Sequence, residues 1–182
     1  MERQRALALI TETVKTKNLV KHLLATEAVM QALSRHFGED QAVWGLAGLV
    51  HDIDYDLTKN NFPQHGKLGA ELLAREGMVN EDILHAVRAH SGQEQPASLM
   101  AWALYCTDPL TGFLVACALI TPSKKIGEID VQFALNRFKE KRFAAGANRD
   151  MIESCTQIGL SLEEFIAIGL EAMQGIANNL GL

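Results

Sequence analysis

Proline and cysteine are both scarce in this chain, with 4 and 3 occurrences in 182 residues. The chain also contains no low-complexity tract and no repeat of fixed period. Disordered segments are usually rich in proline and polar residues, and solenoids show a regular repeat, so neither class is indicated. The apolar fraction of 48% and the charged fraction of 21% are typical of a globular protein. We therefore expect one domain over residues 1–182, long enough to bury a substantial core.

The three cysteines form no CxxC pair, and their number is odd. This argues against both a disulfide framework and a structural zinc site, and it indicates free thiols in a reducing compartment. The short apolar run at residues 6–10 is soon followed by Thr11 and Glu12, so we expect no secretory signal. Together these features predict a cytoplasmic protein.

Only one long apolar stretch is present, at residues 99–120, and it contains Asp108 and Pro109. An aspartate near the middle of a membrane span costs on the order of 2.5–3.5 kcal/mol on insertion scales. Proline would in addition disturb the helix. We therefore expect a buried core helix that is broken or kinked at Pro109, and no membrane partner.

The formal net charge of −5 argues against extended nucleic-acid binding. Residues 121–149 differ from the rest of the chain, since they contain seven basic and three acidic side chains. Such a basic segment can steer an anionic substrate, but it is equally typical of a solvated helix face. Composition does not separate these two interpretations.

Apolar residues recur at helical spacing along most of the chain, and no convincing strand alternation appears. We therefore predict an all-α bundle with short loops, and a loop at residues 53–64. Asn18, Asn80 and Ser161 are candidate N-caps, the last with Glu164 as a capping box. The predicted helices cover residues 2–15, 18–37, 40–51, 65–76, 81–90, 98–120, 130–141, 148–157 and 161–180.

The stretch Gly45–Asp54 ends an apolar helix on two adjacent candidate metal ligands, His51 and Asp52. Neighbouring side chains on a helix diverge by roughly 100°, so both can bind one ion only where the helix ends. The pair alone is weak evidence, because a histidine near a helix C-terminus also complements the helix dipole. Further ligands are therefore needed from elsewhere in the chain.

Four further residues could supply these ligands, because each lies near a predicted helix end or in an apolar setting; they are His22, His65, His90 and Asp108. An unpaired carboxylate would be costly inside the apolar segment, although Asp108 could instead cap a helix that restarts at Pro109. Mixed imidazole and carboxylate ligands favour Fe, Mn, Zn, Ni or Co. Six ligands suffice for one divalent ion, or for two ions bridged by a carboxylate. His36 and His85 lie outside this pattern.

The ordered pattern formed by these six residues resembles the HD superfamily of metal-dependent phosphohydrolases, over about residues 18–112. The resemblance implies an orthogonal helical bundle of the HD-domain type, with the helices of residues 123–182 packed on the motif-bearing core. It also implies that the first metal is bound by His22, His51, Asp52 and Asp108. His65 and His90 would bind a second metal, with Asp52 bridging the two ions.

Two positions depart from the common family sequence HD-I-G-K, since Asp54 replaces the glycine and Tyr55 replaces the lysine. The substrate-side cation must then come from elsewhere, and Lys67, Lys124 and Lys125 are the candidates. Asp54 could orient either a water molecule or a ligating imidazole, as outer carboxylates often do.

The resemblance implies hydrolysis of a phosphomonoester or phosphodiester by metal-activated water, with Asp52, Asp54 and Lys67 as the catalytic residues. The expected partner is a small phosphorylated substrate, for which a nucleotide is the candidate, and the apolar final helix could form a homodimer. Two alternatives stay open. One is a di-iron oxygenase that uses the same ligands, and the other is a non-catalytic HD module that binds a metal or a nucleotide.

Overall fold

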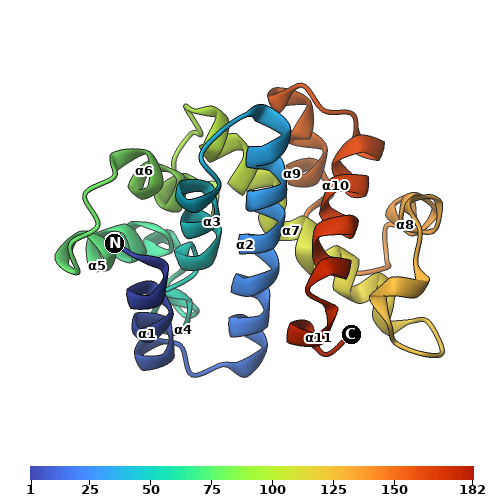
Figure 1. Ribbon diagram of the computed structural model, residues 1–182, viewed down its shortest axis with the longest axis horizontal. Coiled ribbons are helices and arrows are strands. Elements are labelled where there is room, and N and C mark those ends of the chain that lie inside the picture. Colours follow the sequence, from blue (N-terminus) through green and yellow to red (C-terminus); the bar gives the residue numbers. More distant parts are fainter.

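The computed structural model describes residues 1–182 and is helical throughout, with no β-strand. This confirms the predicted all-α fold. In Figure 1, α2 stands at the centre of the molecule with α3 at one side and α10 at the other, and α7 crosses behind α2. The α-helices are α1 (Arg3–Thr13), α2 (Lys17–Phe37), α3 (Gln41–Val50), α4 (Tyr55–Thr58), α5 (Lys67–Arg75), α6 (Glu81–Ala89), α7 (Leu99–Leu119), α8 (Val131–Phe138), α9 (Arg149–Glu153), α10 (Leu162–Gly175) and α11 (Ala177–Leu180). Short 3₁₀ segments cover Phe62–Gln64, Ile126–Glu128 and Ser154–Ile158.

Local capping explains where several of these helices begin. The side chain of Asn80 accepts a hydrogen bond from the Ile83 backbone N–H, and Ser161 and Glu164 form the predicted capping box. The prediction that Asn18 caps α2 is wrong, because α2 begins at Lys17.

The start of α2 is held by a residue that is distant in the sequence. The carboxylate of Asp56 accepts hydrogen bonds from the backbone N–H groups of Lys15 and Thr16, and from the Thr16 hydroxyl. A contact between α4 and the α1–α2 connection therefore supplies what a local cap would otherwise provide.

Three further boundaries differ from the prediction. The expected loop at residues 53–64 contains α4 and a 3₁₀ turn, and the final helix is interrupted at Ile176, between α10 and α11. The expected break at Pro109 is absent, since α7 continues through this residue. Proline removes only one backbone donor, and α7 is packed against α2, α6, α9 and α10, which hold it in place. The alternative that Asp108 caps a restarted helix is therefore excluded.

α7 is long and apolar enough to cross a membrane by length and composition alone. In this fold it is the predicted core helix, and twelve of its residues are buried. Ten of these, all but Thr107 and Thr111, belong to a cluster of 47 buried apolar residues that extends from Ala6 in α1 to Leu180 in α11. α7 thus carries Asp108 into the interior of the bundle.

The close approach of α3 to α2 depends on Gly48. A Cβ atom at this position would lie 2.7 Å from the backbone oxygen of Thr26 in α2, closer than real Cβ contacts allow. The absence of a side chain therefore lets the end of α3 pack directly on α2. This packing brings His51, one turn beyond Gly48, against His22 of α2.

Candidate metal centre

Five separate segments bring the six candidate ligands together. The residues are His22 in α2, His51 and Asp52 at the end of α3, His65 in the turn before α5, His90 at the end of α6, and Asp108 in α7. The six ligands are spread from residue 22 to residue 108 of the sequence. The bundle itself therefore assembles the cluster.

The first half of the cluster is formed by two imidazoles and two carboxylates. The Nε2 atoms of His22 and His51 are 3.1 Å apart, and Oδ1 of Asp108 lies 3.0 Å from the first and 3.7 Å from the second. Oδ2 of Asp52 is 3.7 Å from both Nε2 atoms. His22, His51 and Asp108 form one of two groups whose ligand atoms lie close enough to hold a metal ion.

The second half uses the other oxygen of Asp52. Its Oδ1 atom lies 3.1 Å from Nε2 of His65 and 3.2 Å from Nε2 of His90, and these two nitrogens are 3.2 Å apart. Asp52 therefore directs one oxygen to each half, as a bridging carboxylate would. The second group able to hold a metal combines His51, Asp52 and His90, so His51 lies near both halves.

Every imidazole presents Nε2 to the cluster and is anchored through Nδ1. His51 and His90 each end a helix, and their Nδ1 atoms donate to the carbonyl oxygens three residues earlier, Gly48 at 2.8 Å and Val87 at 2.6 Å. Carbonyl groups in the last turn of a helix lack a partner within the helix, so a histidine at this position can orient itself on its own backbone.

His22 is oriented by a residue that the sequence analysis missed. The hydroxyl of Thr111 donates to the Asp108 carbonyl oxygen at 3.0 Å and accepts from Nδ1 of His22 at 2.9 Å. Thr111 lies three residues after Asp108 on α7, and this helical spacing was the only available signal in the sequence.

Asp54 is fully buried behind His65. Its Oδ1 accepts from Nδ1 of His65 at 2.9 Å, and its Oδ2 accepts from the backbone N–H groups of Gly66 and Gly69, both at 2.9 Å. Both oxygens are thus occupied away from the cluster. Of the two roles expected for Asp54, this arrangement fits the orientation of an imidazole.

The facing nitrogen and oxygen atoms of the cluster suit a bound cation. Because the Nδ1 atoms of His51, His65 and His90 donate to oxygen acceptors, neutral rings must present bare Nε2 lone pairs to one another and to the Asp52 carboxylate. Acceptors that face one another at 3.1–3.2 Å repel unless a proton or a metal ion lies between them. The His and Asp groups of this chain could therefore hold a divalent metal ion.

The pKa values of the cluster residues are shifted because the imidazoles and carboxylates lie so close together. Burial lowers the pKa of His65, but the carboxylates of Asp52 and Asp54 outweigh this effect and raise it to about 10. Burial also lowers the pKa of His51, and Asp52 and Asp108 again outweigh it, so the net pKa of His51 is raised. Burial raises the pKa of Asp52, but His51, His65 and His90 outweigh burial and hold that pKa well below its usual range. In each case the attraction between opposite charges dominates burial.

Solvent reaches the cluster mainly from one side. The side chains of His22 and Asp108 are 21% and 27% exposed, whereas those of His51 and His90 are fully buried. A small molecule can therefore approach the first half of the cluster past His22 and Asp108.

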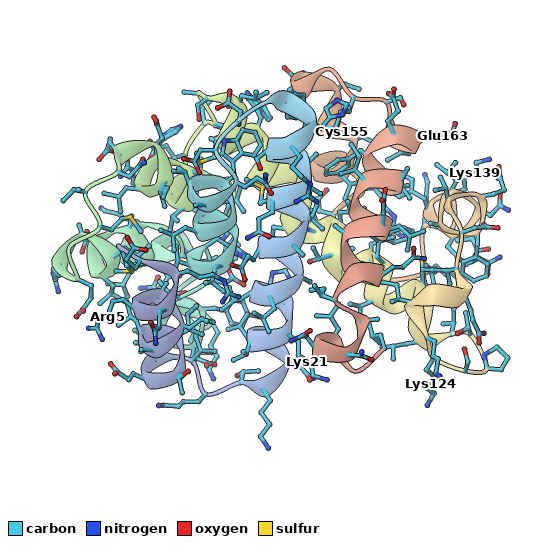
Figure 2. All side chains as sticks on the ribbon, viewed as in Figure 1. Arg5, Lys21, Lys124, Lys139, Cys155 and Glu163 are labelled. Atoms are coloured by element: carbon cyan, nitrogen blue, oxygen red, sulfur yellow. The ribbon has the colours of Figure 1, made fainter.

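The remaining predicted residues lie outside the cluster. Lys67 is exposed at the start of α5, two residues after His65, and makes no ion pair. Tyr55, which replaces the family lysine, packs its ring 5.6 Å from that of His65. Lys124 follows the C-terminus of α7 (Figure 2), and α7 extends by roughly 16 Å between Asp108 and its last residue. Lys124 lies in the turn after α7, outside the cluster.

The sequence of this chain is similar to that of known proteins. The HD domain family model matches residues 19–130 of this chain. The Ribonuclease Y of Sulfurovum sp. is 27% identical to it over 138 residues, which are 74% of this chain and 27% of that protein. The Ribonuclease Y of Nitratiruptor sp. is 32% identical over 95 residues, which are 52% of this chain and 18% of that protein. The chain thus spans about a quarter or less of the length of these curated relatives, and no solved structure matches it.

Proposed function

We propose, from the premise that this chain belongs to the HD domain family, that it hydrolyses a phosphomonoester or phosphodiester of a small molecule, with a nucleotide as the favoured substrate class. The family lies within the metal-dependent phosphohydrolase superfamily. The observation that carries the proposal is the position of Asp52, whose two oxygens face two different pairs of imidazoles.

In this proposal the cluster holds two divalent transition-metal ions. His22, His51 and Asp108 would hold the first ion, His65 and His90 would hold the second, and Asp52 would contribute one oxygen toward each. Bound metal ions of this kind lower the pKa of water and neutralise charge on phosphoryl oxygens. The elements iron, manganese, zinc, nickel and cobalt all suit this mixture of imidazole and carboxylate ligands.

The protein side chains contribute orientation and charge. Asp54 holds His65 in the tautomer that leaves Nε2 free, and Thr111 does the same for His22. The exposed edges of His22 and Asp108 leave the first half of the cluster accessible to a phosphate group. Lys67 is the proposed phosphate contact, because its flexible side chain begins two residues after His65.

The relatives support hydrolysis, and their name refers to a ribonuclease, which cleaves phosphodiesters. They are much longer than this chain and only distantly similar. The relatives therefore support only the reaction class, and the geometry of the cluster carries the substrate proposal.

The test combines metal analysis with hydrolysis assays. Protein purified without added metal should contain up to two equivalents of a transition metal. With Mn²⁺ it should hydrolyse p-nitrophenyl phosphate or bis(p-nitrophenyl) phosphate. His51→Ala and Asp52→Ala should abolish both metal retention and turnover, whereas His36→Ala, at an exposed histidine outside the cluster, should change neither. Full turnover by folded His51→Ala protein would refute the proposal, and O₂-dependent turnover with two bound irons would favour an oxygenase instead.

A further inference from the structure

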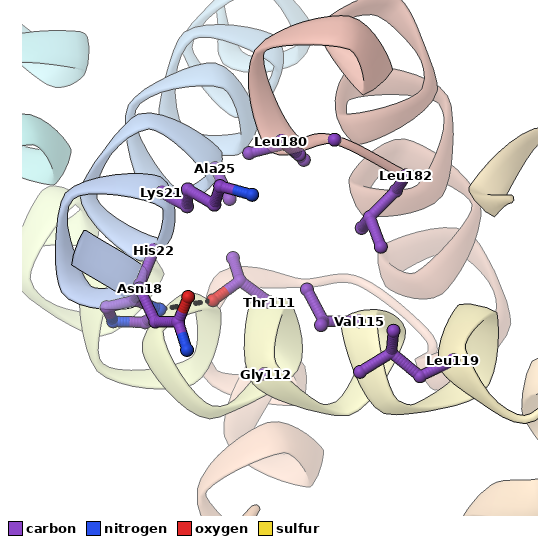
Figure 3. Close-up of a pocket in the computed structure, with 11 residues that line it drawn as sticks. Asn18, Lys21, His22, Ala25, Thr111, Gly112, Val115, Leu119, Leu180 and Leu182 are labelled. Carbon is purple, nitrogen blue, oxygen red and sulfur yellow. Dashed lines mark hydrogen bonds between the residues drawn. The ribbon is translucent and has the colours of Figure 1, made fainter. Parts of the chain in front are cut away.

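A cavity of about 440 Å³ lies directly beside the first half of the metal centre, between α2, α7 and the C-terminal residues that follow α10 (Figure 3). His22 and Thr111 both line it, so a candidate ligand and the hydroxyl that orients it form part of its wall. Cavities of roughly 300–1,000 Å³ are typical of small-molecule sites. This cavity is therefore large enough for the organic part of a substrate whose phosphate lies at the metal centre.

The far wall of the cavity is apolar. Val115 and Leu119 of α7 face Leu180 and Leu182 across it (Figure 3). Leu119 is 50% exposed, which is unusual for a large apolar side chain on an otherwise buried helix. These residues form the end of the cavity farthest from His22, and an apolar end of this kind suits one compact organic group.

The polar groups of the cavity lie nearer to α2. Asn18 can donate and accept hydrogen bonds through its amide, and Lys21 contributes a positive charge. No acidic side chain lines the cavity. An anionic ligand with an uncharged, apolar-faced organic group matches this combination.

A second cavity, of about 390 Å³, meets the first at the metal centre. It contains His22, Asp108 and Ala116, and it shares His22 and Gly112 with the first cavity. A Cβ atom at Gly112 would meet no atom within 4 Å, so no side chain separates the two spaces at this point. A phosphate at the exposed edges of His22 and Asp108 would thus have two directions open to the group attached to it.

We propose that the cavity lined by Val115 and Leu119 binds the organic group of the substrate, a single group of about nucleoside size, and that it selects among phosphoesters. This inference rests on the proposed function for the position of the phosphate. The first cavity is preferred to the second because it combines an apolar end with a lysine side chain, whereas no lysine or arginine lines the second.

Two neighbouring substitutions on α7 separate the cavities. Val115→Phe fills the first cavity, and Ala116→Phe is the matched control, since Ala116 is also half-buried but lines only the second. The probes are adenosine 5′-monophosphate and inorganic phosphate, whose binding to the Mn²⁺-loaded protein is measured by isothermal titration calorimetry. Thermal melting of each variant verifies that it is folded.

The wild-type protein should bind adenosine monophosphate at least about tenfold more tightly than phosphate, a difference that an apolar pocket commonly provides. Val115→Phe should remove this advantage and leave phosphate binding unchanged, whereas Ala116→Phe should retain it. If Val115→Phe does not fold, Leu119→Ala replaces it and should reduce the advantage by shortening the apolar wall.

Three results would overturn the inference: equal binding of both probes to the wild-type protein, loss of the advantage in Ala116→Phe alone, or no binding of either probe. If the binding pattern is as expected but no phosphoester is hydrolysed, the cavity assignment holds and the proposed function fails. Binding and turnover therefore test the two proposals separately.

Discussion

Replacement of Asp54 by asparagine should reverse the tautomer of His65 while leaving the fold intact. Oδ2 of Asp54 accepts two backbone N–H groups, from Gly66 and Gly69. An asparagine must place its amide oxygen there, because its NH₂ group would face two other donors. The NH₂ group then faces Nδ1 of His65, which must become an acceptor.

This change of tautomer removes the free lone pair on Nε2 of His65. A neutral His65 that accepts at Nδ1 carries its proton on Nε2, which points at Oδ1 of Asp52. His65 is then no longer a metal ligand. Loss of an outer-shell carboxylate typically costs roughly 10–100-fold in metal affinity. We expect this loss at the second metal only, because His22, His51 and Asp108 make no contact with Asp54. The lost charge-assisted hydrogen bond should lower the free energy of unfolding by about 1.5–3 kcal/mol.

The assay is metal content at equilibrium, measured by elemental analysis after dialysis against a series of Mn²⁺ concentrations. Long-range ¹⁵N–¹H NMR spectra of the imidazoles should report the tautomer of His65 directly. Asp56→Asn is the matched control, since it makes the same chemical change on α4 at a carboxylate whose hydrogen-bond and ion-pair partners are Lys15, Thr16 and Lys59. Two equivalents bound with wild-type affinity by Asp54→Asn, or loss of both ions, would refute this reasoning.

Three further predictions concern packing and protonation. Gly48→Ala should lower the free energy of unfolding by about 1–3 kcal/mol, because the new methyl group meets the Thr26 backbone. Gly112→Ala should instead raise the free energy of unfolding by about 0.5–1 kcal/mol, because a Cβ atom there meets open space. Urea denaturation measures both changes. Asp56→Asn should destabilise the protein at pH 7, and the difference from wild type in melting temperature should shrink below about pH 4. Hydrogen bonds from the α1–α2 connection lower the pKa of Asp56. The contribution of its carboxylate to stability is therefore present above the ordinary pKa of aspartate and is lost as the pH falls through the lowered pKa. A difference in melting temperature that stays the same at pH 3 would contradict this. Metal binding at pH 7 should release a proton from His65, whose pKa of about 10 in the metal-free protein keeps it protonated, and calorimetry in buffers of different ionisation enthalpy would detect the release.

The sequence by itself determined the helical class and much of the local structure. Apolar periodicity predicted most helices, and Asn80, Ser161 and Glu164 act as caps because capping needs only neighbours in the sequence. The placement of histidines and aspartates near helix ends or in apolar settings, together with the resemblance to the HD superfamily, also indicated which residues would meet. The catalytic role of Lys67 stays a prediction.

Only the tertiary structure decided how those residues are held. Asp56 replaces the expected cap Asn18, α7 continues through Pro109, and Thr111 orients His22. Each outcome depends on contacts between segments far apart in the chain, which local propensity does not encode. The same holds for Asp54, because one carboxylate can face a water molecule or an imidazole, and only the packing of α5 behind it selects the imidazole.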